Sequence, residues 1–191
     1  MLRDLVLNNR SYRGFDESFK VSEEELKELV DMARLTASGA NLQPIKYHLI
    51  TGEKEVEKMN GLTRWGKMLT EITLPHPGQY PTAYILMVVD TDICKDPGKA
   101  DTDVGIAAQT ILLGAVEKGM GGCMIGNFDK AKAFEIFCQK ENHVPVLALA
   151  IGKPLEKVNL VDVGEDGSTK YYRDENDVHY VPKRKLGDVL V

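Results

Sequence analysis

The chain has little of what several classes of protein depend on. Its three cysteines, Cys94, Cys123 and Cys138, are far apart, odd in number and outside any C-x-x-C spacing. This pattern argues against a disulfide framework and against a zinc site. No apolar run approaches the roughly 20 residues that span a bilayer, and Met1 to Asp4 carry a charge pair where a signal peptide needs apolar side chains. We therefore expect a cytoplasmic protein.

Positive charge is also in short supply. The 191 residues include 29 acidic and 24 basic ones, so the formal net charge is -5. Such a chain has no excess of cations to neutralise a long run of phosphates, which argues against nucleic acid as a main partner. The apolar share of 43% is that of an ordinary globular protein. We expect one domain over residues 1–191, with residues 152–191 as a C-terminal extension.

Recognisable side-chain catalysts and metal ligands are missing as well. The sequence has no G-x-S-x-G nucleophile elbow and no His-x-x-x-His pair. Gly119, Gly121 and Gly122 follow a predicted helix and precede a predicted strand, which is the reverse of the dinucleotide-binding order. Asp101 and Asp103 are interpreted as helix-capping residues, because carboxylates favour the positive end of a helix dipole. We predict no metal site and no catalytic side chain.

What is present is a regular alternation of helical and extended patterns. Ser22 and Glu25 form an S-x-x-E capping box, and the prolines within residues 73–82 predict a loop over the surface or over a site. Residues 102–118 are apolar nearly all round, which predicts a central core helix or a subunit interface. Helices are expected over residues 2–6, 22–36, 53–62, 102–118, 129–139 and 186–190, and strands over residues 47–51, 83–89, 123–125 and 144–151.

The basic residues are unevenly spread. Arg10 and Arg13 lie near the start, and Lys183-Arg184-Lys185 lies near the end. These are either two solvated basic spots or two ends of the chain that meet around one anion. Two guanidinium groups and the hydroxyl of Ser11 within four residues suit a phosphate, because arginine presents a rigid fork of donors.

Two further segments have polar groups in loop positions. The loop of residues 37–44 is either a surface for hydrogen bonding to a planar heterocycle or a plain connection from helix to strand. The turn at Gly126 and Asn127 follows a predicted strand and opens a predicted helix, so its amides could point at a ligand, or Asp129 could simply cap that helix.

Together these segments resemble the FMN-dependent nitroreductase family over nearly the whole chain. The resemblance implies an α+β fold, a three-layer sandwich with a mixed, mainly antiparallel sheet flanked by helices, in an intertwined homodimer with two FMN sites at the interface. The segments that carry it are Arg10-Ser11-Tyr12-Arg13, Ser38-Gly39-Ala40-Asn41-Leu42-Gln43-Pro44, Gly119-Met120-Gly121-Gly122-Cys123, Gly126-Asn127-Phe128-Asp129 and Pro182-Lys183-Arg184-Lys185-Leu186.

The resemblance also implies roles for individual residues. Arg10 and Ser11 would hold the FMN phosphate, together with Lys183 and Arg184. Arg13 would approach the N1/O2 side of the ring, where a cation stabilises reduced flavin. The remaining implied contacts with the cofactor are Tyr12, then Ala37, Ser38, Gly39 and Asn41 from the other subunit, and the backbone of Gly126 and Asn127 near flavin N5 and O4.

The chain departs from the family pattern in two places. Asn9 stands where the family usually has a basic residue, and Ala37-Ser38-Gly39 stands where Pro-Ser-Ser is common. The first removes a charge-assisted phosphate contact, and the second removes a hydroxyl at the ring.

The implied activity is an FMN-dependent NAD(P)H oxidoreductase. NADH or NADPH would reduce the flavin, which would then reduce a nitroaromatic, a quinone or a similar acceptor by ping-pong transfer. Trp65 and Tyr80 are candidates for the substrate side, although Trp65 could equally belong to the core. The alternatives are specialised flavin chemistry, namely dehalogenation or flavin breakdown, and a non-catalytic flavin-binding protein.

Overall fold

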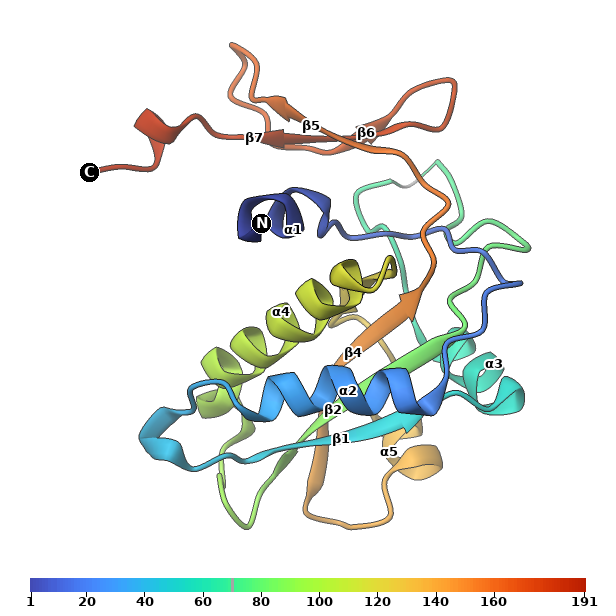
Figure 1. Cartoon of the computed structure of the whole chain (residues 1–191), viewed down its shortest axis with the longest axis vertical. Coiled ribbons are helices and arrows are strands. Elements are labelled where there is room, and N and C mark those ends of the chain that lie inside the picture. Colours follow the sequence, from blue (N-terminus) through green and yellow to red (C-terminus); the bar gives the residue numbers. More distant parts are fainter. Residues whose placement is uncertain (70) are drawn as a thin grey trace.

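A four-stranded sheet forms the centre of the molecule, with strand order β1-β2-β4-β3 and antiparallel pairing throughout (Figure 1). The computed structural model describes residues 1–69 and 71–191. The helices are α1 (Leu2–Asn8), α2 (Glu23–Arg34), α3 (Glu53–Leu62), α4 (Asp101–Glu117) and α5 (Lys130–Phe137), and the strands of this sheet are β1 (Ile45–Ile50), β2 (Ala83–Asp90), β3 (Gly121–Ile125) and β4 (His143–Gly152).

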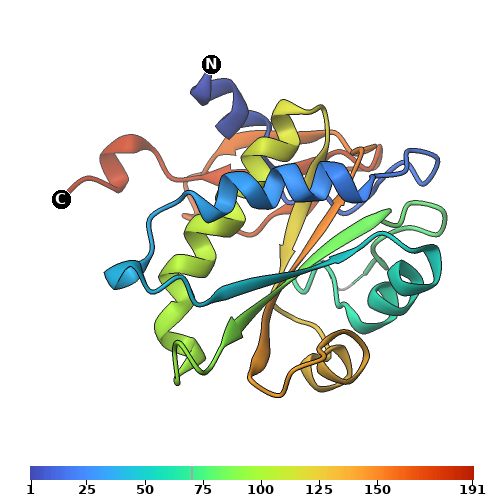
Figure 2. The same ribbon diagram turned by 60° about the horizontal axis from the view of Figure 1, so that its bottom comes forward.

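The sheet separates two hydrophobic cores. Ile85 and Met87 of β2 pack with residues of α2 and α4, whereas Tyr84 and Leu86 pack with residues of α3 and α5. This division arises because successive side chains of a strand point to opposite faces. Figures 1 and 2 show α2 and α4 crossing over the same side of the sheet. The result is the expected three-layer α+β sandwich.

The periodic segments before residue 152 formed the types of element that they predicted. Ser22 and Glu25 make the capping box of α2, and Gly119 ends α4 in the left-handed conformation with φ of 73°. The first strand begins at Ile45, earlier than predicted. The charged side chain of Lys46 is tolerated there, because β1 is only half-buried until Ile50.

Residues 152–191 contain more structure than their sequence pattern predicts. They form a second sheet of order β5-β7-β6, with β5 (Val158–Asp162), β6 (Tyr172–Arg173) and β7 (His179–Lys183). β5 and β7 are parallel, so the parallel pairing lies in this small sheet and not in the central one. A short 3₁₀ helix, Leu186–Asp188, replaces the helix expected at residues 186–190. The C-terminal sheet lies beyond α1 (Figure 1).

One flank of α4 faces outward in the single chain. Val104, Ala108 and Ile111 are buried, but Ile106 is 37% exposed and Leu113 is half-buried. The expectation of burial on most sides is therefore not met within one chain. Among the described residues, no helix is long and apolar enough to cross a membrane.

Candidate functional site

The two basic segments meet at one cavity. This cavity has a volume of about 290 Å³, and its lining includes Arg10, Ser11 and Arg13 from the segment after α1 together with His179 and Lys183 from β7. The structure thus brings both ends of the chain together, and Asn9 also lines the cavity. Arg184 follows the end of β7 and is not among the described residues that line it.

The segment after α1 is held against the edge of the central sheet. Ser11 forms a parallel bridge with Gly122, and the Tyr12 amide donates to the Gly122 carbonyl at 3.1 Å. A Cβ atom at Gly121 would lie only 2.7 Å from the Tyr12 ring. Glycine is needed there, because a larger residue would push Tyr12 and its neighbours away from β3. In this chain Tyr12 anchors the segment and does not line the cavity.

A buried ion pair fixes the position of Arg13. Glu156 Oε1 accepts from the Arg13 backbone amide at 2.9 Å and from Arg173 Nη2 at 2.5 Å. The side chains of Glu156 and Arg173 are 3% and 6% exposed. This carboxylate therefore ties the N-terminal segment to the C-terminal sheet. The Arg13 guanidinium lies 5.0 Å from the centre of the Tyr171 ring, a cation–π arrangement that holds it in place.

A second cavity lies on the other side of Arg13 and Tyr171. It has a volume of about 150 Å³, and both residues line it as well as the first cavity. Its other walls include Trp65, Gly126 and Asn127. Arg13 is thus common to the basic cavity and to the pocket that contains the predicted backbone donors.

The walls of this second cavity have distinct properties. Trp65 Nε1 donates to Thr63 Oγ1 at 2.9 Å and the indole meets the edge of Phe15, so Trp65 both lines the cavity and packs on the core. Burial raises the pKa of Cys123 to about 11. The Cys123 thiol is therefore neutral near pH 7 and is no candidate for a nucleophile.

The turn at Gly126 and Asn127 is firmly held at its ends and open in the middle. The Asn127 carbonyl accepts from the Arg64 amide at 2.9 Å, and Asp129 caps α5 by accepting from the Lys132 amide at 3.0 Å. A Cβ atom at Gly126 would meet nothing within 4 Å. The capping role of Asp129 is confirmed, whereas amides of this turn that point at a ligand stay a prediction.

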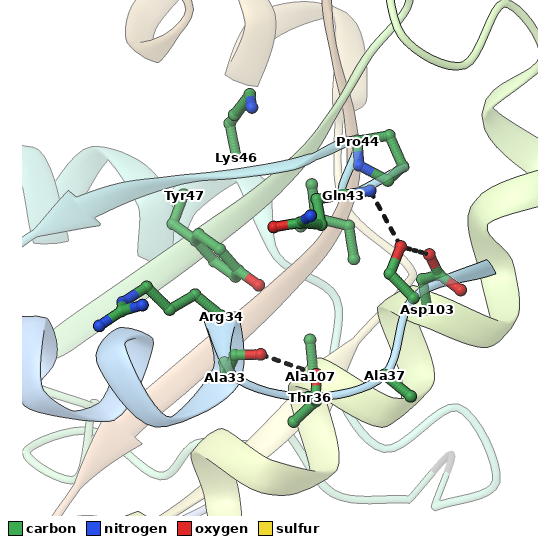
Figure 3. Close-up of a pocket in the computed structure, with 12 residues that line it drawn as sticks. Ala33, Arg34, Thr36, Ala37, Gln43, Pro44, Lys46, Tyr47, Asp103 and Ala107 are labelled. Atoms are coloured by element: carbon green, nitrogen blue, oxygen red, sulfur yellow. Dashed lines mark hydrogen bonds between the residues drawn. The ribbon is translucent and has the colours of Figure 1, made fainter. Parts of the chain in front are cut away.

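The loop of residues 37–44 lines neither of these two cavities. Ala37 and Ser38 line a third cavity of about 190 Å³, which shares no described lining residue with the first two (Figure 3). Gly39 and Asn41 are exposed. Within one chain, these four predicted contacts are therefore separate from the basic cavity.

Asp103 holds this loop, and its predicted role as a helix cap is wrong. Its Oδ2 atom accepts from Ser38 Oγ at 2.5 Å, and its Oδ1 atom accepts from the Gly39 amide at 3.0 Å. The residue before α4 is Ala100, which makes no side-chain cap. The carboxylate lies in the first turn of α4 but turns toward the loop, because two loop donors at the same place need an acceptor (Figure 3).

Tyr80 lines neither the basic cavity nor the second cavity. It lines a broad groove of about 970 Å³ with Glu17 and Lys20, and its amide donates to Glu17 Oε1 at 2.8 Å. Within the described residues, Tyr80 and Trp65 share no cavity.

Sequence reasoning missed four residues that shape these cavities: Asp103, Glu156, Tyr171 and His179. The last three belong to the polar C-terminal region, where no motif or periodic pattern marks them. Only the pairing of β7 with β5 and β6 brings His179 and Tyr171 beside the N-terminal arginines.

The fold and the cavities define a class: a three-layer α+β protein with a cationic cavity and an adjoining pocket lined by Trp65, Tyr171 and the turn at Gly126 and Asn127. The profile of the Nitroreductase family matches residues 6–153. The chain belongs to this family, whose members are oxidoreductases.

Relatives agree with that assignment. An oxygen-insensitive NADPH nitroreductase of Helicobacter acinonychis is 24% identical, and the alignment covers 82% of this chain and 90% of the relative. A solved structure from Staphylococcus epidermidis carries the name of an NAD(P)H:FMN oxidoreductase. Its TM-score with this chain is 0.72 at 19% sequence identity, and the alignment covers 100% of this chain and 95% of the Staphylococcus chain. A solved structure from Exiguobacterium sibiricum carries the name of a nitroreductase in complex with FMN. Its TM-score with this chain is 0.65 at 22% sequence identity, and the alignment covers 82% of this chain and 89% of the Exiguobacterium chain.

Proposed function

We propose that this protein is an FMN-dependent NAD(P)H oxidoreductase that reduces electron-poor acceptors such as nitroaromatics and quinones. The observation that carries the proposal is the convergence of Arg10, Ser11 and Lys183 on one cavity, with Arg13 leading from it into the second cavity. Family membership supports an oxidoreductase, and the FMN complex of the Exiguobacterium relative supports the choice of flavin.

The residues present fit the cofactor. In the first cavity, Arg10 Nε is buried without a hydrogen-bond partner among the described residues, and so are both ring nitrogens of His179. Buried nitrogens that can form hydrogen bonds normally have a hydrogen-bond partner, and the oxygens of a phosphate would provide one. Arg10, Ser11 and Lys183 would hold the phosphate, while Arg184 lies next to this set in the sequence.

The ring would extend toward the second cavity. Bound flavin supplies the hydride and electron transfer. Arg13 would place a fixed positive charge beside the ring, and the backbone of Gly126 and Asn127 would orient it. No side chain acts as an acid or base in this scheme.

We propose further that the protein works as a homodimer. The loop residues Ala37, Ser38, Gly39 and Asn41 lie apart from the basic cavity of their own chain, so they would complete the site of a partner subunit. The outward flank of α4 exposes Ile106, which such a partner would cover. A cytoplasmic location stays a prediction.

Two other functions remain as alternatives. The same scaffold could carry out specialised flavin chemistry, either dehalogenation or flavin breakdown, or it could bind flavin without catalysis. An experiment that follows the flavin itself distinguishes these from reduction of nitroaromatics and quinones.

The test is an anaerobic titration of the purified protein loaded with FMN. We expect NADH or NADPH to bleach the visible absorbance of the oxidised flavin, and a nitroaromatic or a quinone added afterwards to restore it. Flavin that binds but stays oxidised with both nicotinamides would support the non-catalytic alternative. Reduced flavin that neither acceptor reoxidises would support specialised chemistry, and a chain that binds no FMN would overturn the proposal.

A further inference from the structure

His179 is buried in the wall of the basic cavity with its hydrogen-bonding groups unused. The residue is 1% exposed, it lines the cavity, and neither ring nitrogen has a partner among the described residues. Its ring packs against the edge of Tyr171 at 5.4 Å between centres. A neutral imidazole has one donor and one acceptor, and leaving both unpaired in a buried place is costly.

The charges around His179 are mostly positive. Arg10, Arg13 and Lys183 share the cavity with it. Arg173 pairs with His179 across the antiparallel strands β6 and β7 and forms ion pairs with Glu156 and Asp177. Burial, followed by the charges of Arg13 and Arg173, lowers the pKa of His179 to about 4, against a smaller opposing effect of Asp177. Without an anion, the ring is therefore neutral near pH 7.

We propose that His179 is a direct ligand of the flavin phosphate and that it takes up a proton when the phosphate binds. This inference rests on the proposed function. A phosphate in the cavity would carry between one and two negative charges near pH 7. It would offset the positive charges around the ring, since an opposite charge at hydrogen-bond distance favours the charged form. The proton comes from solvent and goes to a ring nitrogen, which then donates to a phosphate oxygen.

The first experiment counts protons on the unchanged chain. The heat of binding of FMN to protein freed of flavin is measured near neutral pH in two phosphate-free buffers of different ionisation enthalpy, and riboflavin is titrated in parallel. We expect net proton uptake with FMN and none with riboflavin, which lacks the phosphate. This comparison needs no variant, so it does not depend on whether a substitution is tolerated.

The second experiment uses the variant His179→Gln. Glutamine keeps a polar group of similar reach but takes up no proton. We expect FMN binding to weaken roughly 10- to 100-fold, the usual effect of losing a charge-assisted hydrogen bond. Riboflavin affinity should stay unchanged, and the proton uptake should disappear. Thermal unfolding checks that the variant is folded.

His48→Gln is the matched control. The Nε2 atom of His48 is also buried without a partner among the described residues, but His48 lies in β1 and does not line the basic cavity. We expect FMN affinity and proton uptake like those of the unchanged chain.

The outcomes separate the inference from the proposed function. FMN binding without proton uptake, and with equal affinity in His179→Gln, would overturn the inference and leave the flavin function standing. Equal weakening of FMN and riboflavin would also overturn it, because it would show a purely structural role. A chain that binds neither flavin would overturn both proposals.

Discussion

At the scale of single residues, two adjacent cations near the C-terminus occupy different places. Lys183 is the last residue of β7 and lines the basic cavity, whereas Arg184 lies just outside that lining. The resemblance to the family implied a phosphate contact for both. The position of β7 now favours Lys183.

We predict that Lys183→Ala weakens FMN binding more than Arg184→Ala does. Loss of an exposed charge-assisted contact costs about 1–2 kcal/mol, or roughly 5- to 30-fold in affinity. Both variants remove one positive charge, so Arg184→Ala controls for long-range attraction. Fluorescence titration with FMN measures the difference, and equal losses would contradict the assignment of the contact to Lys183 in preference to Arg184.

A second prediction concerns acid stability of the flavin-free protein. In the unfolded chain, His179 takes up a proton as the pH falls through about 6.5, whereas in the folded chain it does so only near pH 4, where its pKa lies. Between these values the unfolded state binds more protons, so the free energy of unfolding decreases as the pH falls.

The measurement is urea unfolding at a series of pH values between these limits. The free energy of unfolding of His179→Gln should depend less steeply on pH than that of the unchanged chain, since residue 179 can no longer take up a proton. Parallel curves would show that burial does not suppress protonation of His179.

At the scale of elements, the loop between α2 and β1 depends on one carboxylate from α4. Ala40, Asn41 and Gln43 all have positive φ values, between 48° and 56°. Such conformations are strained for residues other than glycine and persist only when the surroundings impose them. The hydrogen bonds from Ser38 and Gly39 to Asp103 provide that constraint.

We predict that Asp103→Ala loosens this loop and lowers the free energy of unfolding by about 1–3 kcal/mol, because it removes part-buried hydrogen bonds to a charged group. Hydrogen exchange of the Gly39 amide should become faster. Asp101→Ala is the control, because Asp101 lies in the same turn but is exposed. Equal effects of the two substitutions would attribute the loss to the dipole of α4 and not to the loop.

The same scale shows how far patterns predict structure. The helices α2 and α4 followed from capping and periodicity, because local preference and burial act there in the same direction. The strands β5 and β7 did not, because their residues are mostly half-buried and show no clear alternation. Their pairing is parallel and joins residues far apart in sequence, which no local window can detect.

At the scale of the whole molecule, the exposed flank of α4 predicts association. We expect light scattering to show that the purified protein is a dimer. The variant Ile106→Glu should shift it toward monomer, because a buried unpaired charge at an interface is costly. The same variant should weaken FMN retention at least several-fold. Ile136→Glu is the matched control, since Ile136 on α5 is similarly exposed at 43%, against 37% for Ile106. A monomer with full FMN affinity would contradict the dimeric site.

Composition and local pattern alone determined the ordinary globular character, the main helices and strands, and the presence of two basic clusters at opposite ends of the chain. Those properties depend on neighbouring residues, which a sequence displays directly. Only the tertiary structure brought Arg10 and Lys183 to one cavity, turned Asp103 toward the loop and buried His179 beside the arginines. These contacts join distant segments, and their geometry is set by packing across the whole fold.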